Sequence, residues 1–267
     1  MDFKELLSEF LGTTLANGDD ILDKFACIPG AVVGKGNTPL ERYVYIPGTR
    51  RDRVVLVAHM DTIWDVSYGN TALGENKVVF SEGVFSSLNP DCGIGADDRA
   101  GCAMLWALRD CGHSILLVDG EEHGKLGARC LKKTNKKLFR ELNRHCYMIE
   151  FDWAGTDGCL FNQVENTKRF KKYIADELGF KDSKKRGGTD LQILCDKVCG
   201  VNLGIGYHHC HSKNETLVLR EWENTYEKVS RFLAGEQKRF RTSFFGKCIT
   251  FLKRCARKVK RTLKKAS

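Results

Sequence analysis

Residues capable of metal binding and acid–base chemistry recur in short segments along the sequence. The segments are VAHMD (57–61), GADDRAG (95–101), VDGEEHG (118–124), IEFDW (149–153), GGTD (187–190) and GYHHCHSKNE (206–215). Each follows an expected strand or lies beside a Gly-rich turn. The carboxyl ends of strands in an open α/β sheet form the crevice in which such sheets bind ligands. We therefore expect these separated segments to converge on one site.

Two imidazoles and three carboxylates in these segments form a set of nitrogen and oxygen ligands. They are His59, Asp97, Glu122, Asp152 and His211. This set suits Zn²⁺, and also Mn²⁺ or Co²⁺. Five ligands exceed the three that one catalytic zinc takes from a protein, but they suffice for two ions roughly 3.5–4 Å apart if one carboxylate bridges them. In the pair Glu121–Glu122, one residue would bind metal and the other would take a proton from an activated water.

The elements that must position these residues alternate along the chain. Apolar runs predict strands at 43–46, 53–58, 78–80, 114–118, 147–151 and 200–205, and helical periodicity predicts helices at 3–11, 21–25, 99–108, 125–132, 170–178 and 220–233. Such alternation indicates an α/β fold with helices on both faces of the sheet. We expect a three-layer αβα sandwich around a mixed, mostly parallel sheet.

Composition limits the class of protein. The 267 residues are 42% hydrophobic, which excludes wholesale disorder, and they contain no run of 18 apolar residues that would form a transmembrane helix. The N-terminal segment MDFKELLSEF does not resemble a secretory signal. The 12 cysteines include no CxxC pair, so we expect reduced, mostly buried thiols in a cytoplasmic protein and no cysteine among the metal ligands.

The net charge of +9 belongs to the end of the chain. Residues 236–267 contain 12 Lys and Arg and one acid, a local charge of +11, which leaves −2 for residues 1–235. We expect a catalytic domain at 1–235 and a basic tail at 236–267. Apolar residues three or four apart predict an amphipathic helix in the tail, which suits an anionic membrane surface, an acidic partner or nucleic acid. Packing on the body, or disorder, is the alternative, and the oligomeric state stays open.

Three of the segments resemble a known clan of enzymes. Residues 59–62 (HMDT), 95–101 (GADDRAG) and 119–122 (DGEE) look like the co-catalytic two-metal exopeptidases. This clan includes tripeptidase T, the carboxypeptidase-G-like enzymes and the compact bacterial leucyl aminopeptidases. The resemblance runs from about Val54 to Glu215. It is specific for the clan and less specific for one branch.

The resemblance implies two metal sites, most suitably for two Zn²⁺, that share one carboxylate. His59 and Asp152 would each bind one metal, and Asp97 would bridge both. Glu122 and His211 would hold the second metal.

The resemblance also assigns supporting roles. Glu121 would be the general base. Asp61 would accept a hydrogen bond from the free ring nitrogen of His59 and so fix its tautomer. The peptide bond between Asp97 and Asp98 is often cis in such relatives.

Two positions depart from the pattern of the clan or leave a choice open. The last motif offers His208, His209 and His211. We choose His211 because a small hydroxyl residue and then an acid follow it, while His208 or His209 could face substrate instead. Many relatives have an arginine where this chain has Trp153, so the chain departs from the clan at this position.

The spacing of the last two ligands excludes a lid. Only 58 residues separate Asp152 from His211, too few for the lid or dimerisation domain, of about 100 residues, that tripeptidase-like members insert there. Lidded members use a lid histidine to stabilise the oxyanion. We therefore assign this role to Tyr207, whose phenol could donate to a developing oxyanion. In the GGTD turn, Asp190 could face the terminal group of a substrate.

These residues predict hydrolysis of amide bonds in short peptides. An aminopeptidase or a di- or tripeptidase is the leading hypothesis. A carboxypeptidase, or an amidase or deacylase acting on a non-peptide amide, would use the same site. A catalytically inactive binding module targeted by its basic tail is the alternative from another class, and the complete set of ligands and base argues against it.

Overall fold

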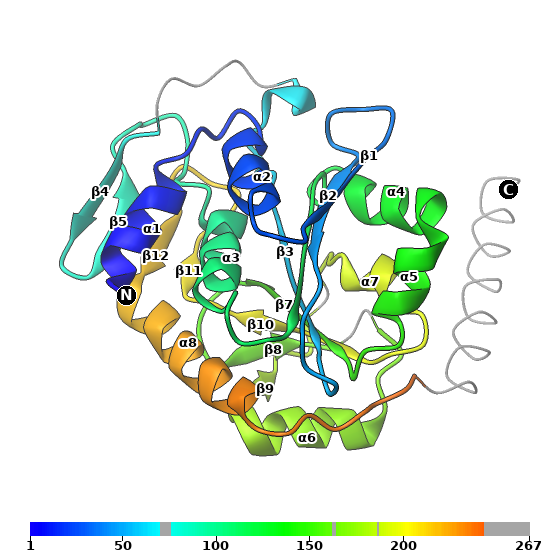
Figure 1. Ribbon diagram of the computed structural model, residues 1–267. Coiled ribbons are helices and arrows are strands. Elements are labelled where there is room, and N and C mark those ends of the chain that lie inside the picture. Colours follow the sequence, from blue (N-terminus) through cyan, green and yellow to red (C-terminus); the bar gives the residue numbers. More distant parts are fainter. Residues whose placement is uncertain (70–75, 162–163, 186, 243–267) are drawn as a thin grey trace, which may run out of the picture.

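The computed structural model describes residues 1–69, 76–161, 164–185 and 187–242 (Figure 1). Its main β-sheet has eight strands. Its order is β1-β2-β6-β3-β7-β10-β8-β9. The strands are β1 (Val32–Lys35), β2 (Arg42–Ile46), β3 (Val55–His59), β6 (Ser114–Val118), β7 (Met148–Trp153), β8 (Gly158–Leu160), β9 (Lys181–Asp182) and β10 (Gly200–Gly204). The predicted strands inside this sheet are confirmed.

The centre of the sheet is parallel. Strands β6, β3, β7 and β10 run in one direction, whereas β1, β2 and β8 join through antiparallel pairs. Every residue of β3, β6 and β10 is buried. The apolar runs of β3 and β6 follow from this burial, because a central parallel strand is covered on both faces. The carboxyl ends of β6, β3 and β7 therefore lie side by side.

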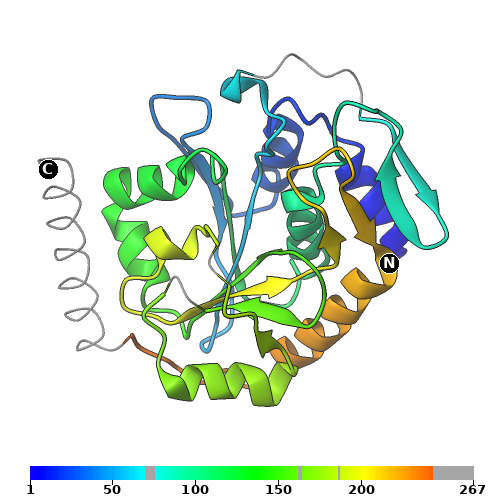
Figure 2. The same ribbon diagram turned by 180° about the vertical axis from the view of Figure 1, so that it is seen from behind.

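Helices cover both faces of the main sheet (Figures 1 and 2). One face carries α1 (Phe3–Leu11), α2 (Asp19–Ala26), α3 (Ala96–Ala107) and α8 (Leu219–Ala234), and the other carries α4 (Leu126–Thr134), α5 (Lys136–Leu142) and α7 (Leu191–Leu194). Alternate residues of β3 enter two separate cores: Leu56 belongs to the core that contains residues of α1 and α3, and Val55 and Val57 belong to the core that contains residues of α4 and α5. The three-layer sandwich is confirmed.

A second, antiparallel sheet lies beside α1 and was largely missed from the sequence. Its order is β11-β12-β5-β4, with β4 (Val78–Ser81), β5 (Val84–Ser87), β11 (Tyr207–His208) and β12 (Thr216–Val218). Only β4 was predicted, because strands of two to four residues give little periodicity. This sheet holds both ends of the turn at 209–215, and β12 runs directly into α8.

The interval between Asp152 and His211 belongs to the same domain. Strands β8, β9 and β10 extend the main sheet, while α6 (Lys168–Leu178) packs on α8 and α7 packs on β10. The described residues of this interval thus contain no inserted lid, which agrees with the spacing in the sequence.

The chain continues to pack on the body beyond the predicted boundary at residue 235. Gln237 and Phe240 are buried, and Arg241 forms a bridge with Val198. The phenyl ring of Phe240 packs against the rings of Tyr147, Phe170 and Tyr173. The remainder of the predicted basic tail, 243–267, lies outside the described residues.

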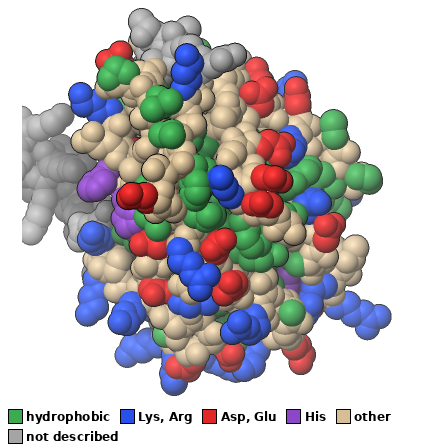
Figure 3. Space-filling view, turned by 90° about the vertical axis from the view of Figure 1, so that its left-hand side faces the viewer, with side chains coloured by type: hydrophobic (Ala, Val, Ile, Leu, Met, Phe, Trp, Pro, Cys, Tyr) green, Lys and Arg blue, Asp and Glu red, His purple; other side chains and the backbone are tan. Residues whose placement is uncertain are grey.

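The surface seen in Figure 3 carries charged side chains of both signs among hydrophobic ones, with basic side chains more frequent toward its lower edge. This mixture agrees with the near balance of acids and bases in residues 1–235. No helix in the described part of the chain is both long and apolar enough to cross a membrane.

Trp222 provides a test of the packing between α8 and α3. Its indole is fully buried, its Nε1 donates to the carbonyl oxygen of Ala100 at 3.0 Å, and its ring stacks on Tyr226. We expect Trp222→Ala to lower the free energy of unfolding by about 3–5 kcal/mol, because it leaves a cavity and an unpaired carbonyl. Urea denaturation measures this change. Leu88→Ala, at a side chain that is 64% exposed, should change stability by less than about 0.5 kcal/mol.

Candidate metal centre

The five predicted metal ligands come together at the carboxyl edge of the main sheet. His59 is the last residue of β3, Asp152 lies near the end of β7, and Glu122 follows β6. Asp97 lies at the start of α3 and His211 in the turn after β11. Each residue thus comes from the end of a different element, as the topology of the sheet requires.

His59, Asp97 and Asp152 form one half of the centre. His59 Nε2 lies 3.2 Å from Asp97 Oδ1 and 3.6 Å from Asp152 Oδ1. One ligand atom from each residue lies within 4.8 Å of the other two. All three side chains are at least nine-tenths buried. Such a compact, dry group of one nitrogen and two carboxylates suits a divalent cation.

His211 and Glu122 form the other half, on the opposite side of Asp97. His211 Nε2 lies 3.1 Å from Asp97 Oδ2 and 2.6 Å from Glu122 Oε1. Asp97 therefore presents Oδ1 to one imidazole and Oδ2 to the other. This is the arrangement that a bridging carboxylate between two cations needs.

The centre contains a buried carboxylate oxygen that a cation would satisfy. Glu122 Oε1 is buried, and no donor is well aligned with it, although His211 Nε2 lies only 2.6 Å away. An unsatisfied buried carboxylate oxygen is costly, and a cation bound by both side chains would satisfy it. The side chains therefore fit divalent metal ions.

The pKa values of these groups are shifted by burial and by their mutual charges, and the shifts agree with an excess of negative charge in the centre. Burial raises the pKa of the Asp152 carboxyl to about 8, and the charge of Asp97 adds to the rise. Burial also acts to raise the pKa of Asp97, but the imidazoles of His211 and His59 outweigh it and lower that pKa. Contacts with Asp97 and Glu122 raise the pKa of His211 to about 11. Protons on the imidazoles thus balance carboxylates that a metal would neutralise.

Asp61 contacts His59 through its backbone and its side chain. His59 Nδ1 donates to the main-chain carbonyl oxygen of Asp61 at 3.0 Å, and the carboxylate oxygen Oδ1 lies 3.3 Å from the same nitrogen. The carboxylate of Asp61 also accepts from the backbone N–H groups of Glu121 and Glu122, at 3.0 and 3.2 Å. Asp61 therefore orients His59, in line with its predicted position, and also fixes the Glu121–Glu122 turn.

The backbone around Asp97 is held from both sides. Glu215 accepts hydrogen bonds from the N–H groups of Gly95, at 2.7 Å, and Asp97, at 3.0 Å. Asp98, joined to Asp97 by a cis peptide bond as the resemblance implies, accepts from the N–H of His59 at 3.0 Å. Gly101 allows α3 to approach β7, since a Cβ there would lie 2.3 Å from the Phe151 carbonyl oxygen.

Glu121 contacts a lysine that the sequence did not reveal. Lys125 Nζ lies 2.6 Å from Glu121 Oε1, and both side chains are largely buried. Burial alone would lower the pKa of Lys125, but the charge of Glu121 outweighs it and the pKa is raised. Gly188 leaves room for this pair, because a Cβ there would lie 2.8 Å from Lys125 Nζ. No motif pointed to Lys125, since it lies one turn beyond the acidic pair.

A pocket of about 440 Å³ opens onto the centre. It is lined by Asp97, Glu121, Glu122, Gly124, Lys125, Asp152, Trp153, Ala154, Lys185, Gly187, Gly188, Tyr207, Cys210 and His211. The hydroxyl of Tyr207 donates to Asp152 Oδ1 at 3.2 Å. Trp153 gives the pocket an aromatic wall.

Two residues suggested for substrate contact lie elsewhere. His208 Nε2 lies 2.8 Å from Glu221 on α8, outside the pocket lining. Asp190 is fully buried behind the pocket, where its backbone N–H donates to Glu150. The expectation that Asp190 faces the terminal group of a substrate is therefore wrong, because the GGTD turn directs that side chain inward.

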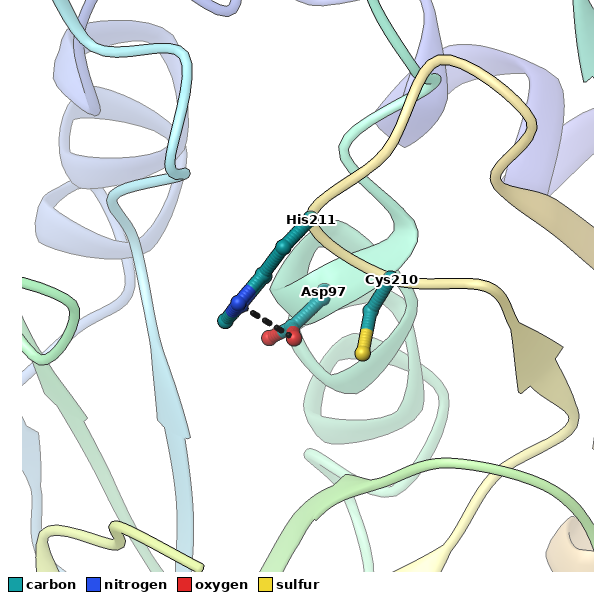
Figure 4. A group of neighbouring side chains, drawn as sticks. All are labelled: Asp97, Cys210 and His211. Atoms are coloured by element: carbon teal, nitrogen blue, oxygen red, sulfur yellow. Dashed lines mark ion pairs between the residues drawn. The ribbon is translucent and has the colours of Figure 1, made fainter.

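Cys210 is the residue that the sequence interpretation excluded. Its Sγ, one carboxylate oxygen of Asp97 and one ring nitrogen of His211 all lie within 4.8 Å of one another (Figure 4). Cys210 therefore lies near two of the predicted ligands, although no cysteine was expected among them.

Solved structures of peptidases share this fold. No model of a protein family and no curated protein sequence matches the chain. Aminopeptidase PepT from Bacillus cereus is a solved structure that aligns with 15% identity and a TM-score of 0.63, over 87% of this chain and 97% of that one. A tripeptidase from Staphylococcus aureus aligns with 14% identity and a TM-score of 0.62, over 87% and 97%.

A third solved structure, the TET1 peptidase of Pyrococcus horikoshii, aligns with 14% identity and a TM-score of 0.58, over 88% of this chain and 100% of that one. This chain has the fold of these peptidases. This shared fold agrees with the resemblance seen in the sequence.

Glu215 tests how the backbone of Asp97 is held. We expect Glu215→Gln to lower the free energy of unfolding by about 1–3 kcal/mol, because one amide hydrogen of Gly95 or Asp97 loses its acceptor. The same variant should bind Zn²⁺ more weakly, which isothermal titration calorimetry measures. Glu236→Gln, at an exposed position, serves as the matched control. Unchanged stability and metal affinity in Glu215→Gln would contradict the positioning role.

Proposed function

We propose that this chain is a metal-dependent hydrolase that cleaves peptide bonds in short peptides, with two Zn²⁺ as the metals that suit its ligands best. The proposal depends chiefly on one observation: the two oxygens of Asp97 face two imidazoles in a pocket that also contains Glu121. The peptidase fold supports the same activity. Mn²⁺ and Co²⁺ would also fit a set of nitrogen and oxygen ligands.

The metals and the protein would divide the chemistry. Bound ions would acidify a water molecule and polarise the scissile carbonyl group. Glu121 would take the proton from the attacking water and deliver it to the leaving amine. Lys125 would hold the Glu121 carboxylate at the pocket wall, and Asp61 would hold its backbone.

Tyr207 would donate a hydrogen bond to the developing oxyanion. Its phenol is buried at the pocket wall, and its hydroxyl already reaches the Asp152 carboxylate. Rotation of the hydroxyl hydrogen toward a bound carbonyl oxygen would supply the donor without moving the ring.

The enzyme could remove residues from either end of a peptide. An aminopeptidase is the first, since the acidic centre would attract a free α-amino group. A carboxypeptidase is the second, and it is favoured by Lys125 and Lys185 in the pocket lining, because ammonium groups suit a substrate carboxylate. An inactive binding module is disfavoured by the complete set of ligands and base.

A screen of dipeptides distinguishes these activities. The metal-free protein would be loaded with Zn²⁺, Mn²⁺ or Co²⁺ and assayed with free, N-blocked and C-blocked dipeptides. An aminopeptidase should cleave free and C-blocked peptides, and a carboxypeptidase should cleave free and N-blocked ones. Absence of turnover on all three classes by metal-loaded protein would contradict the proposed function.

Glu121→Gln tests the base. We expect kcat to fall by about 10²- to 10⁴-fold, because glutamine cannot accept the proton. Metal content, measured by mass spectrometry, should stay at the wild-type level. Glu177→Gln, at an exposed position on α6, is the matched control and should keep full activity. Retention of more than a few per cent of activity by Glu121→Gln would show that another group is the base.

A further inference from the structure

A thiol lies beside the half of the metal centre formed by Glu122 and His211. Cys210 Sγ lies within 4.8 Å of a carboxylate oxygen of Asp97 and a ring nitrogen of His211, and Cys210 lines the same pocket. Figure 4 shows the sulfur and the imidazole reaching toward the Asp97 carboxylate from the turn after β11. Three types of ligand atom thus face one small volume.

The backbone of the turn explains how two neighbouring residues reach the same place. Consecutive side chains of an extended strand point to opposite sides. Here His209 and His211, which flank Cys210, have φ values of 55° and 59°. Left-handed conformations are uncommon outside glycine and cluster at functional sites. The turn brings the side chains of Cys210 and His211 into one pocket.

We propose that Cys210 is a thiolate ligand of the metal that Asp97, Glu122 and His211 bind. The proposal rests on the metal centre of the proposed function and adds a ligand to it. On metal binding the thiol would release its proton to solvent, and one sulfur–metal bond would form. No electron is transferred. The site would then have one sulfur, one nitrogen and two oxygen ligands.

The distances allow this ligation. Bonds of about 2.3 Å from zinc to sulfur and about 2.0 Å to nitrogen place these two atoms roughly 3.6 Å apart in a tetrahedral site. The present separation is at most 4.8 Å, so small rotations of side chains would complete the site.

A sulfur ligand would make the two halves of the centre different. The half with His59 and Asp152 offers only nitrogen and oxygen, whereas the half with Cys210 would also offer a soft donor. Soft donors favour Zn²⁺ and Cd²⁺ over Mn²⁺. We therefore expect the site that contains Cys210 to prefer Zn²⁺ and Cd²⁺ over Mn²⁺. The affinity of the other site for these ions should not depend on Cys210.

Cobalt substitution tests the ligand directly. The metal-free full chain would be titrated with Co²⁺, and a thiolate-to-cobalt charge-transfer band in the near ultraviolet should grow with one of two bound ions. Cys210→Ser should lose the band while still binding cobalt. Cys27→Ser, at an exposed thiol, should keep it. Two bound Co²⁺ ions without the band, or a band that survives in Cys210→Ser, would overturn the proposal.

Metal competition gives a second readout that a purely structural role would not produce. Cys210→Ser should lose at least about tenfold in Cd²⁺ affinity at one site, with little change for Mn²⁺. An equal loss for both ions would overturn the proposal. Failure of the wild-type chain to bind any of these metals would instead remove the metal centre on which the proposed function depends.

Discussion

The mutual repulsion of buried carboxylates is the constraint on which the rest of this structure depends. Asp61, Asp97, Asp98, Glu121, Glu122, Asp119, Glu150, Asp152 and Asp190 gather around one edge of the sheet, most of them fully buried. The outer members are paired with cations, as Asp119 is with Arg42 and Glu121 with Lys125. Among the inner members, Asp97 and Asp152 lie beside the imidazole of His59, and Asp97 and Glu122 lie beside that of His211. This difference leaves an excess of negative charge at the place where ligand atoms converge.

The protein holds this charge in place through backbone hydrogen bonds. Asp61 accepts from two amides after β6, and Glu215 accepts from two amides before α3. Each of these acids thus connects segments that are about 60 and 120 residues apart in the sequence. Because β3, β6 and β7 are rigid central strands, the ligand-bearing loops begin from fixed positions. The second sheet does the same for the turn that carries His211.

The sequence predicted the parts of the structure that repeat or resemble a known pattern. The long buried strands and amphipathic helices followed from apolar periodicity, and the five candidate ligands were proposed from their positions after the strands and from the resemblance to the clan. The second sheet was missed because β5, β11 and β12 have four residues or fewer. The contacts of Lys125 with Glu121 and of Cys210 with Asp97 were not predicted, because no sequence motif of the clan includes these two positions. The inward direction of Asp190 depends on packing of the GGTD turn against Glu150, which no local pattern encodes.

The position of Glu215 has a consequence for how this centre can change over evolution. Its carboxylate holds the backbone of Asp97, and Asp97 serves both halves of the centre. A substitution of Glu215 or Asp97 would therefore change the geometry of both halves of the centre at once. Gradual divergence of one half has to proceed through residues that serve it alone, such as Asp152 on one side and Glu122 or Cys210 on the other. The shared residues are the least free to vary, although one of them never faces the pocket.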